Sequence, residues 1–176
     1  MKKFFVLSLT VLLLSGCGVT LNSVVQKDLT KTYKNTLVIL PFEKHRTETF
    51  TDNLKRNLEE TFTSNNQKIE VLLIEADDRD ALKLNANDGN ETLINNAVSR
   101  DKKDLVIFFK PVSLEYYNGY QLQAASYQLI GIDIETKKEV WKANFTSRGG
   151  SLGPSLFAKT SAQKIFQQIK ADKILD

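Results

Sequence analysis

Three short apolar runs, separated by polar segments, constrain the fold of this chain more than any other sequence feature. They are Thr36–Phe42 (TLVILPF), Ile69–Ile74 (IEVLLI) and Leu105–Phe109 (LVIFF). Runs of this length that are rich in Val, Ile, Leu and Phe predict strands buried on both faces of a sheet. Because a helix-length segment separates the first two runs, we expect parallel pairing at the start of the sheet.

Amphipathic patterns predict the helices around these strands. One helix is indicated by four apolar residues spaced four apart, namely Phe50, Leu54, Leu58 and Phe62. Thr49 or Thr51 can cap its start. A second helix is predicted over Asn90–Arg100, and a third begins at Pro154 after Gly153. The apolar residues of the third helix are Leu156, Phe157, Ile165, Phe166 and Ile169.

Alternating segments in the second half of the chain predict an antiparallel hairpin. The third strand continues to Tyr117, and the dipeptide Asn118-Gly119 tolerates the positive φ angles that a tight hairpin turn requires. A return strand through Ile134 and a second turn at Glu135–Lys138 lead into Val140–Phe145. Trp141, Ala143 and Phe145 share one face of that last strand, so we expect a helix to pack there.

The predicted order of elements is β-α-β-α-β-β-β-α. This order favours the α/β (α+β) class, with a single mixed sheet and helices mainly on one face. A composition of 41% hydrophobic and 26% charged residues is typical of a globular domain, which we place at residues 36–176. Gly18–Tyr33 shows no sustained period, so residues 17–35 are expected to be a flexible tether, with a short structured piece allowed near its end.

The N-terminus resembles a bacterial export signal. Lys2 and Lys3 precede Phe4–Leu14, which is apolar except for a Ser and a Thr and is too short to cross a bilayer as a helix. The next residues, LSGC at 14–17, resemble the lipobox of bacterial lipoproteins, and Cys17 is the only cysteine. This resemblance implies that residues 1–16 are a signal peptide and that acyl chains are attached to Cys17.

A lipidated Cys17 would anchor the domain to a membrane essentially permanently. In lipoproteins of double-membrane bacteria an Asp after the cysteine commonly retains the protein at the inner membrane, whereas here Gly18 follows. The resemblance therefore implies the outer membrane, with the domain facing the periplasm. In a bacterium with one membrane, the same anchor would place the domain on its outer face.

The body of the chain resembles a loose superfamily of envelope lipoprotein domains. The resemblance rests on Leu40-Pro41-Phe42, on the helix after it and on the late hairpin Gly131–Trp141, and it covers most of residues 36–172. The superfamily includes the periplasmic activators of penicillin-binding proteins, the amino-terminal domain of the Tol-system propeller protein and the curli-secretion channel lipoprotein. It implies roles in binding and assembly, without catalysis.

Familiar catalytic and metal-binding patterns are missing from the sequence. One Cys and one His exclude a disulfide framework and His-rich or Cys-rich zinc sites. His45 lies among charged residues, no G-x-S-x-G is present, and the acidic clusters 77–80 and 87–90 do not fit a calcium loop. The glycine-rich stretch Arg148–Gly153 lacks the ending of a P-loop, and we interpret it as a mobile connector. We therefore expect no enzyme activity, no cofactor and no metal.

The net charge of +3 indicates no nucleic-acid surface, so a protein partner is expected. Tyr116, Tyr117 and Tyr120 at the hairpin tip are the candidate partner-binding residues, since exposed tyrosines anchor many interfaces. The alternative is that they form cross-strand pairs. We therefore hypothesise a lipid-anchored adaptor that binds another envelope protein, or itself, through the hairpin and a sheet edge. The alternative hypothesis is a carrier of a small apolar or glycan ligand.

Overall fold

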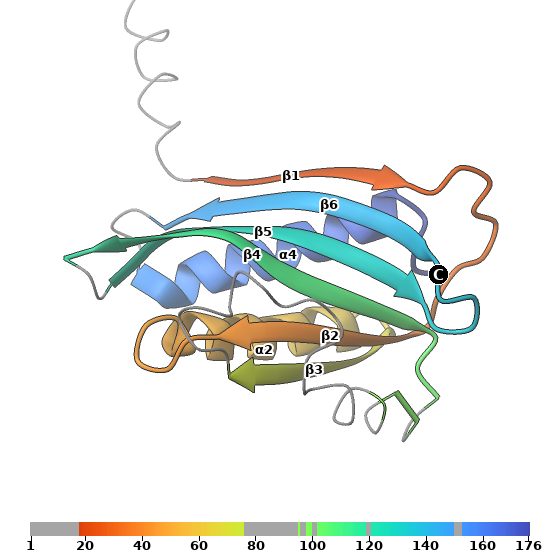
Figure 1. Cartoon of the computed structure of the whole chain (residues 1–176), viewed down its shortest axis with the longest axis horizontal. Helices are drawn as coiled ribbons and strands as arrows, with labels where there is room; N and C mark the ends of the chain where they lie inside the picture. Colours follow the sequence, from red (N-terminus) through yellow and green to blue (C-terminus); the bar gives the residue numbers. More distant parts are fainter. Residues whose placement is uncertain (1–17, 76–94, 96–97, 100–101, 119–120, 150–152) are drawn as a thin grey trace, which may run out of the picture.

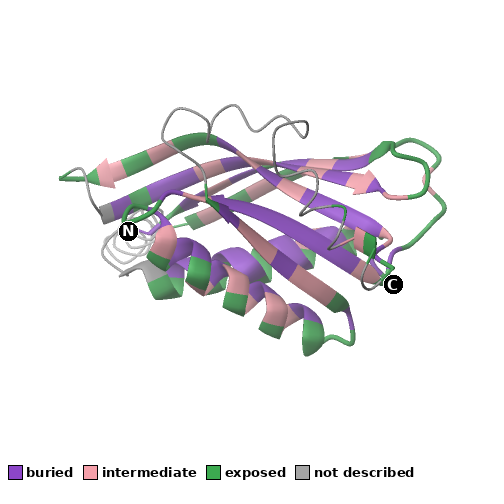
Figure 2. Cartoon of the chain, turned by 60° about the horizontal axis from the view of Figure 1, so that its bottom comes forward, coloured by how far each residue is buried: buried purple, intermediate pink, exposed green. Residues whose placement is uncertain are grey.

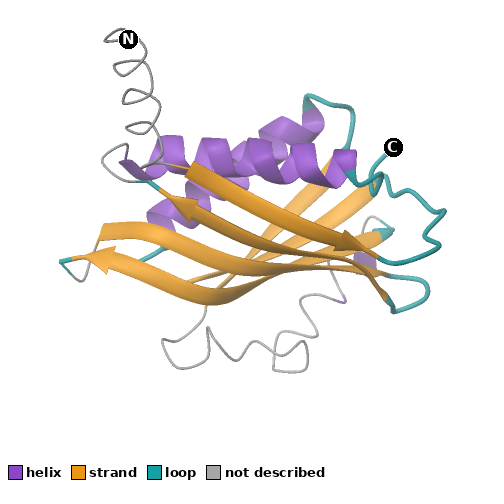
Figure 3. Cartoon of the chain, turned by 90° about the horizontal axis from the view of Figure 1, so that it is seen from above, coloured by secondary structure: helices purple, strands orange, loops and turns teal. Residues whose placement is uncertain are grey.

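A six-stranded mixed sheet with two helices on one face forms the body of the protein (Figures 1 and 3). The computed structural model describes residues 18–75, 95, 98, 99, 102–118, 121–149 and 153–176. The elements in chain order are β1 Gly18–Val25, β2 Asn35–Phe42, α2 Glu48–Thr63, β3 Lys68–Glu75, β4 Leu105–Tyr117, β5 Gln121–Asp133, β6 Glu139–Arg148 and α4 Gly153–Ala171.

The strand order in the sheet is β1-β6-β5-β4-β2-β3. β2 pairs in parallel with both β3 and β4, whereas the pairs β4–β5, β5–β6 and β6–β1 are antiparallel. The β4–β5 hairpin closes where Tyr117 faces Gln121, next to Asn118 with its positive φ of 48°. The predicted fold class, the parallel start and the long hairpin are therefore confirmed.

The main core lies between the sheet and the two helices, as the buried inner surfaces in Figure 2 show. α2 contributes its stripe of four apolar residues, and α4 contributes Phe157, Ile165, Phe166 and Ile169. Aromatic rings join the two helices, because Phe50 and Phe62 of α2 contact rings of α4 at centroid distances of 4.6 and 5.0 Å. As expected, the buried face of β6 packs toward α4, with Trp141, Ala143 and Phe145 in this core.

The opposite face of the sheet carries a smaller apolar cluster of Leu37, Ile39, Ile74 and Val106. β2 lies between β4 and β3 and is buried on both faces, so Leu37 and Ile39 enter this cluster while Val38 and Leu40 face the helices. Val98, Phe108 and Ile134 pack partly buried against it. Most of the predicted helix Asn90–Arg100 lies outside the described residues.

Gly18–Val25 corrects the expectation of a flexible tether, because these residues form an edge strand paired with β6 along its whole length. The side chains of Val19, Leu21 and Val25 are partly buried against the main core, whereas those of a flexible tether would be exposed to solvent. Further along, Tyr33 is fully buried. The packed domain thus includes Gly18–Val25 and does not begin at residue 36.

Two further details at the helix ends differ from the sequence expectations. The N-cap of α2 is Thr47, instead of Thr49 or Thr51, and its side chain makes no capping hydrogen bond. The Thr47 hydroxyl instead accepts a 2.7 Å hydrogen bond from the backbone N–H of Glu43 in the preceding turn. Leu156 lies on the outer side of α4 and is 47% exposed, while Phe157 fills the core. Neither helix of the described residues has the length and apolar character needed to cross a bilayer.

Candidate functional site

The backbone of the β1 edge points away from the sheet at every second residue. Gln26 donates its backbone N–H to Val140 at 2.9 Å, which sets the alternation along β1. Even-numbered residues therefore pair with β6, and the backbone groups of Val19, Leu21, Ser23 and Val25 face outward. Within the described part of the chain no hydrogen bond reaches these outward groups. The strand, GVTLNSVV, also carries no charge that would discourage pairing with another strand.

A polar network holds the inner side of β1 against α4. Asp172, at the end of that helix, accepts hydrogen bonds from the Ser23 hydroxyl, from the Trp141 indole N–H at 2.7 Å and from the Gln168 amide at 3.0 Å. Gln168 also donates to Ser23 at 2.9 Å. Beside this network, β1 and α4 line an open groove of about 480 Å³. Its lining residues are Val19, Thr20, Leu21, Asn22, Lys164, Gln167, Gln168 and Ala171.

The other edge strand, β3, is covered at Val71 by side chains of α2. Lys55 donates to the backbone carbonyl of Val71 at 2.8 Å, and the Val71 N–H donates to the Glu59 carboxylate at 3.4 Å. Lys55 and Glu59 are also an ion pair one helical turn apart. An edge backbone satisfied by side chains cannot accept an incoming strand without losing these bonds. The two edges of the sheet therefore differ in availability.

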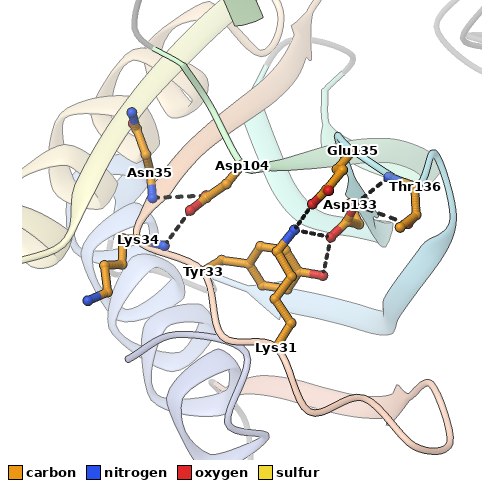
Figure 4. Close-up of polar contacts among 8 residues, drawn as sticks. All are labelled: Lys31, Tyr33, Lys34, Asn35, Asp104, Asp133, Glu135 and Thr136. Carbon is orange, nitrogen blue, oxygen red and sulfur yellow. Dashed lines mark hydrogen bonds and ion pairs between the residues drawn. The ribbon is translucent and has the colours of Figure 1, made fainter.

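A buried carboxylate, Asp133, ties the segment after β1 to the β5–β6 turn (Figure 4). One oxygen accepts from the Lys31 ammonium at 2.8 Å and from the Tyr33 hydroxyl at 2.9 Å. The other accepts from the Thr136 backbone N–H at 2.7 Å and from its hydroxyl at 3.0 Å. Glu135 reinforces Lys31 from the solvent side at 3.1 Å. We call Lys31, Tyr33, Asp133, Glu135 and Thr136 the Asp133 cluster.

The charges of the Asp133 cluster stabilise one another and indicate a structural role. Burial alone would raise the pKa of Asp133, but the hydrogen bonds from Lys31, Thr136 and Tyr33 outweigh it and hold that pKa well below its usual range. The hydrogen bonds to Asp133 and Glu135 raise the pKa of Lys31. Burial, and then the bond to Asp133, raises the pKa of Tyr33. Asp133, Lys31 and Tyr33 are therefore held in their ordinary charge states at neutral pH, and none of the three is poised to exchange a proton there.

Backbone contacts secure the same segment at its far end. The Asp104 carboxylate accepts from the backbone N–H groups of Lys34 and Asn35 at 2.9 and 3.0 Å (Figure 4). Lys34 also pairs with Asp176 at the C-terminus, and Leu175 forms a bridge to Tyr33. The chain between β1 and β2 is thus fixed to three separate parts of the domain.

The tyrosines predicted as a partner-binding cluster lie in different settings. The Tyr116 hydroxyl donates to the Glu43 carboxylate at 3.1 Å, and the Arg46 guanidinium lies 4.8 Å from the centre of the Tyr116 ring. Tyr117 is 55% exposed on the hairpin, and Tyr120 lies outside the described residues. Partner binding through these side chains stays a prediction.

The remaining sequence candidates fall in loops or outside the described residues. Cys17, the acidic clusters 77–80 and 87–90, and 150–152 of the glycine-rich stretch lie outside. His45 is exposed in the β2–α2 loop with a positive φ of 64°. Gly149 is buried against Phe157, where a Cβ would lie 3.2 Å from the ring, so this end of the glycine-rich stretch is packed.

Pockets within the described residues are open and lined largely by polar side chains. One of about 380 Å³ is lined by Asn35, Thr63, Gln67, Lys68, Ile69 and Lys103. Another, of about 200 Å³, lies beside the Asp133 cluster. A carrier of an apolar ligand needs a concave and largely apolar site, so these pockets do not favour the carrier hypothesis.

Within the described residues, the structure thus defines an α+β domain whose β3 edge is bound by side chains at Val71 and whose β1 edge is not. No protein-family model matches the chain, and no curated protein matches its sequence. Among solved structures, the PelC dodecamer from Paraburkholderia phytofirmans is similar, with 14% identity over 85% of this chain and 95% of PelC and a TM-score of 0.50. A single-substitution PelC variant, also a dodecamer, has 13% identity over 84% and 95% and a TM-score of 0.54.

Lipoprotein GNA1162 from Neisseria meningitidis is a more distant likeness, with 13% identity over 78% of this chain and 99% of that one and a TM-score of 0.43. At such identities the PelC likeness shows a shared fold alone. The relation to penicillin-binding-protein activators, the Tol protein and the curli channel stays an expectation.

The open edge and the Asp133 cluster were missed by the sequence reasoning. Val19, Leu21 and Val25 do alternate in the sequence, which was an available signal, but the polar Ser23 interrupts it. Ser23 is compatible with the inner face only because it forms hydrogen bonds with Asp172 and Gln168. Both residues are distant in the sequence, so a local pattern cannot predict these contacts.

Proposed function

We propose that this protein is a lipid-anchored, non-catalytic adaptor of the cell envelope that binds a protein strand along β1. The observation that carries the proposal is the open and uncharged edge of β1, set against the covered edge of β3. The partner strand comes from another envelope protein or from a second copy of this chain. Strand addition of this kind gains affinity from main-chain hydrogen bonds and specificity from the neighbouring groove.

The placement in the envelope is supported by the sequence resemblance to a lipobox. Acyl chains on Cys17 would anchor the domain at the outer membrane, facing the periplasm. Self-association is supported by the fold, since the similar PelC structures are dodecamers. The absence of catalysis is part of the proposal. It is supported by Asp133, whose buried carboxylate accepts structural hydrogen bonds from Lys31, Tyr33 and Thr136.

The β1 edge offers four residues with outward N–H and C=O groups, namely Val19, Leu21, Ser23 and Val25. A partner strand paired there would lie above the groove between β1 and α4, whose Gln167, Gln168 and Lys164 side chains can bind its polar groups. The sheet would then continue from six strands to seven without moving an existing element.

Cross-linking of the full-length protein in intact cells tests this proposal. Val19→Pro removes an outward N–H and introduces a ring that blocks pairing, and its fixed φ is compatible with a strand. Val19→Ala loses more of the side chain but keeps the N–H, so it is the matched control. We expect cross-linked complexes with Val19→Ala and none with Val19→Pro. Complexes that persist with a folded Val19→Pro protein would contradict strand addition.

A second pair of variants avoids the risk that proline unfolds β1. Asn22 and Asn144 face each other on the exposed surface of β1 and β6, one at the edge and one a strand further in. Asn22→Lys places a charge at the edge and should weaken association, because edge lysines oppose strand pairing. Asn144→Lys should not. Equal effects of both variants would indicate a face of the sheet, rather than its edge, as the binding surface.

A further inference from the structure

The position of Gly18 fixes where the membrane lies relative to the domain, if Cys17 carries the lipid. β1 begins at Gly18, so a single peptide unit of about 3.8 Å separates the anchored residue from a strand that is hydrogen-bonded into the sheet. A lipid anchor with so short a connection cannot let the domain tumble freely. One end of the sheet must stay close to the headgroups.

The strand register identifies which other residues lie at that end. Gly18 pairs with Arg148, Arg148 with Ala124, and Ala124 with Glu115, so these four form one row across the sheet. Tyr117 lies two residues beyond this row, or about 7 Å along the strand. α4 starts at this same end, as Figures 1 and 3 show.

The surface of this end suits a bilayer interface. Tyr117 is 55% exposed and Leu156, in the first turn of α4, is 47% exposed. Tyrosine rings favour the headgroup region, where the ring is partly dry and the hydroxyl is wet. At this end Arg148 pairs with Glu115 and Arg46 with Glu43, both at 3.3 Å.

The opposite end of the sheet carries several charged side chains. It holds the Asp133 cluster, the exposed Lys34 paired with Asp176, and the turn that carries Lys137 and Lys138. Taking these charges into a headgroup layer would cost solvation free energy, so this end faces water.

We propose that the protein stands upright on the bilayer, with the Gly18 end of the sheet, Tyr117 and Leu156 in the headgroup region of the lipids. This inference rests on the proposed lipid anchor, and it restricts the proposed partner. β1 then runs away from the membrane, and an antiparallel partner strand runs toward it. A second copy anchored in the same membrane presents its own β1 in the same direction, so two β1 strands cannot pair antiparallel.

Tryptophan fluorescence of the full-length lipidated protein tests the orientation. Tyr117→Trp places a reporter at the proposed interface, and Val24→Trp places one on the same sheet face at the far end of β1, where Val24 is 72% exposed. Each protein is reconstituted into phosphatidylcholine vesicles with or without bromine on the acyl chains near the headgroup. Trp141 is buried in the core and contributes an equal background to both.

We expect bromine to reduce the added fluorescence of Tyr117→Trp about twofold and to leave that of Val24→Trp unchanged, because quenching needs contact with the lipid interface. Leu156→Trp should behave like Tyr117→Trp, and it replaces that variant if a tryptophan at position 117 prevents folding.

Quenching of both reporters would show that the sheet lies flat on the membrane, and quenching of neither would show that the domain is held away from it. Either result overturns the inference. Intact mass separates the two proposals: protein without acyl chains overturns the anchor, whereas lipidated protein with an unquenched Trp at 117 overturns the orientation alone.

Discussion

The two edges of the sheet, β1 and β3, meet the problem of an exposed backbone in opposite ways. On β3, Lys55 and Glu59 of α2 bind both backbone groups of Val71. On β1, side chains secure only the inner side, through Ser23, and the outward backbone is left open. Side chains of the described residues thus bind the outward backbone at one edge of the sheet, β3, and leave it unbound at the other, β1.

The attachment of β1 is also of a different kind from that of β3. β3 is an edge strand paired in parallel with the central strand β2, and α2 packs over it. β1 lies at the periphery and depends on polar contacts to Asp172 and, through the following segment, to Asp133. A buried polar group that loses its hydrogen-bond partner costs free energy. We therefore expect Asp172 and Asp133 to determine whether β1 stays paired to the sheet.

Asp133→Ala should give the largest loss of stability. It leaves the buried Tyr33 hydroxyl and Thr136 without their acceptor and leaves Lys31 with Glu135 alone, and we expect the free energy of unfolding to fall by about 3 kcal/mol. Glu135→Ala is the control, since Glu135 shares Lys31 but its side chain is 81% exposed and should contribute less than about 0.5 kcal/mol. Urea unfolding of both variants measures this difference. Equal losses would show that burial of Asp133 does not matter.

Asp172→Ala should destabilise the protein less but act more locally. It removes the acceptor of the buried Trp141 indole and of Ser23, at an expected cost of about 2 kcal/mol. Hydrogen exchange should then accelerate in β1 while β3 stays protected. Faster exchange in both edge strands would mean that β1 and β3 open together, which would contradict their independent attachment.

The sequence predicted the centre of this fold better than its edge. β2, β3, β4 and α2 were predictable because their apolar periods are continuous and their burial follows from local pattern alone. β1 was not, since Ser23 is compatible with an inner face only beside Asp172, which lies at the other end of the chain. The sequence places Asp133 in the return strand of the hairpin, and its role depends on Lys31 and Tyr33, which only folding brings to it. Contacts of this length leave no periodic signal.

Acid should loosen the β1 side of the molecule through Asp133. The pKa of Asp133 is lowered by folding, so its contribution is complete well above the unfolded value of 3.8 and is lost as the pH falls through the folded value. The difference in unfolding free energy between the native protein and Asp133→Asn should therefore narrow by about 1 to 2 kcal/mol between pH 7 and pH 2. Urea unfolding at several pH values measures it, and a constant gap would contradict the charge as its origin.

Opening the β3 edge should cost the least stability and give the sharpest test of the contrast. Lys55→Ala with Glu59→Ala removes a partly exposed ion pair, so we expect a loss of under about 1 kcal/mol. The same change frees the Val71 backbone for an incoming strand. Sedimentation of the detergent-solubilised protein should reveal new association that Val19→Pro, which acts only on β1, does not remove. If the double variant associates no more than the native protein, then Lys55 and Glu59 are not what keeps β3 unpaired. The lack of such side chains on β1 would then no longer explain why β1 is available for pairing.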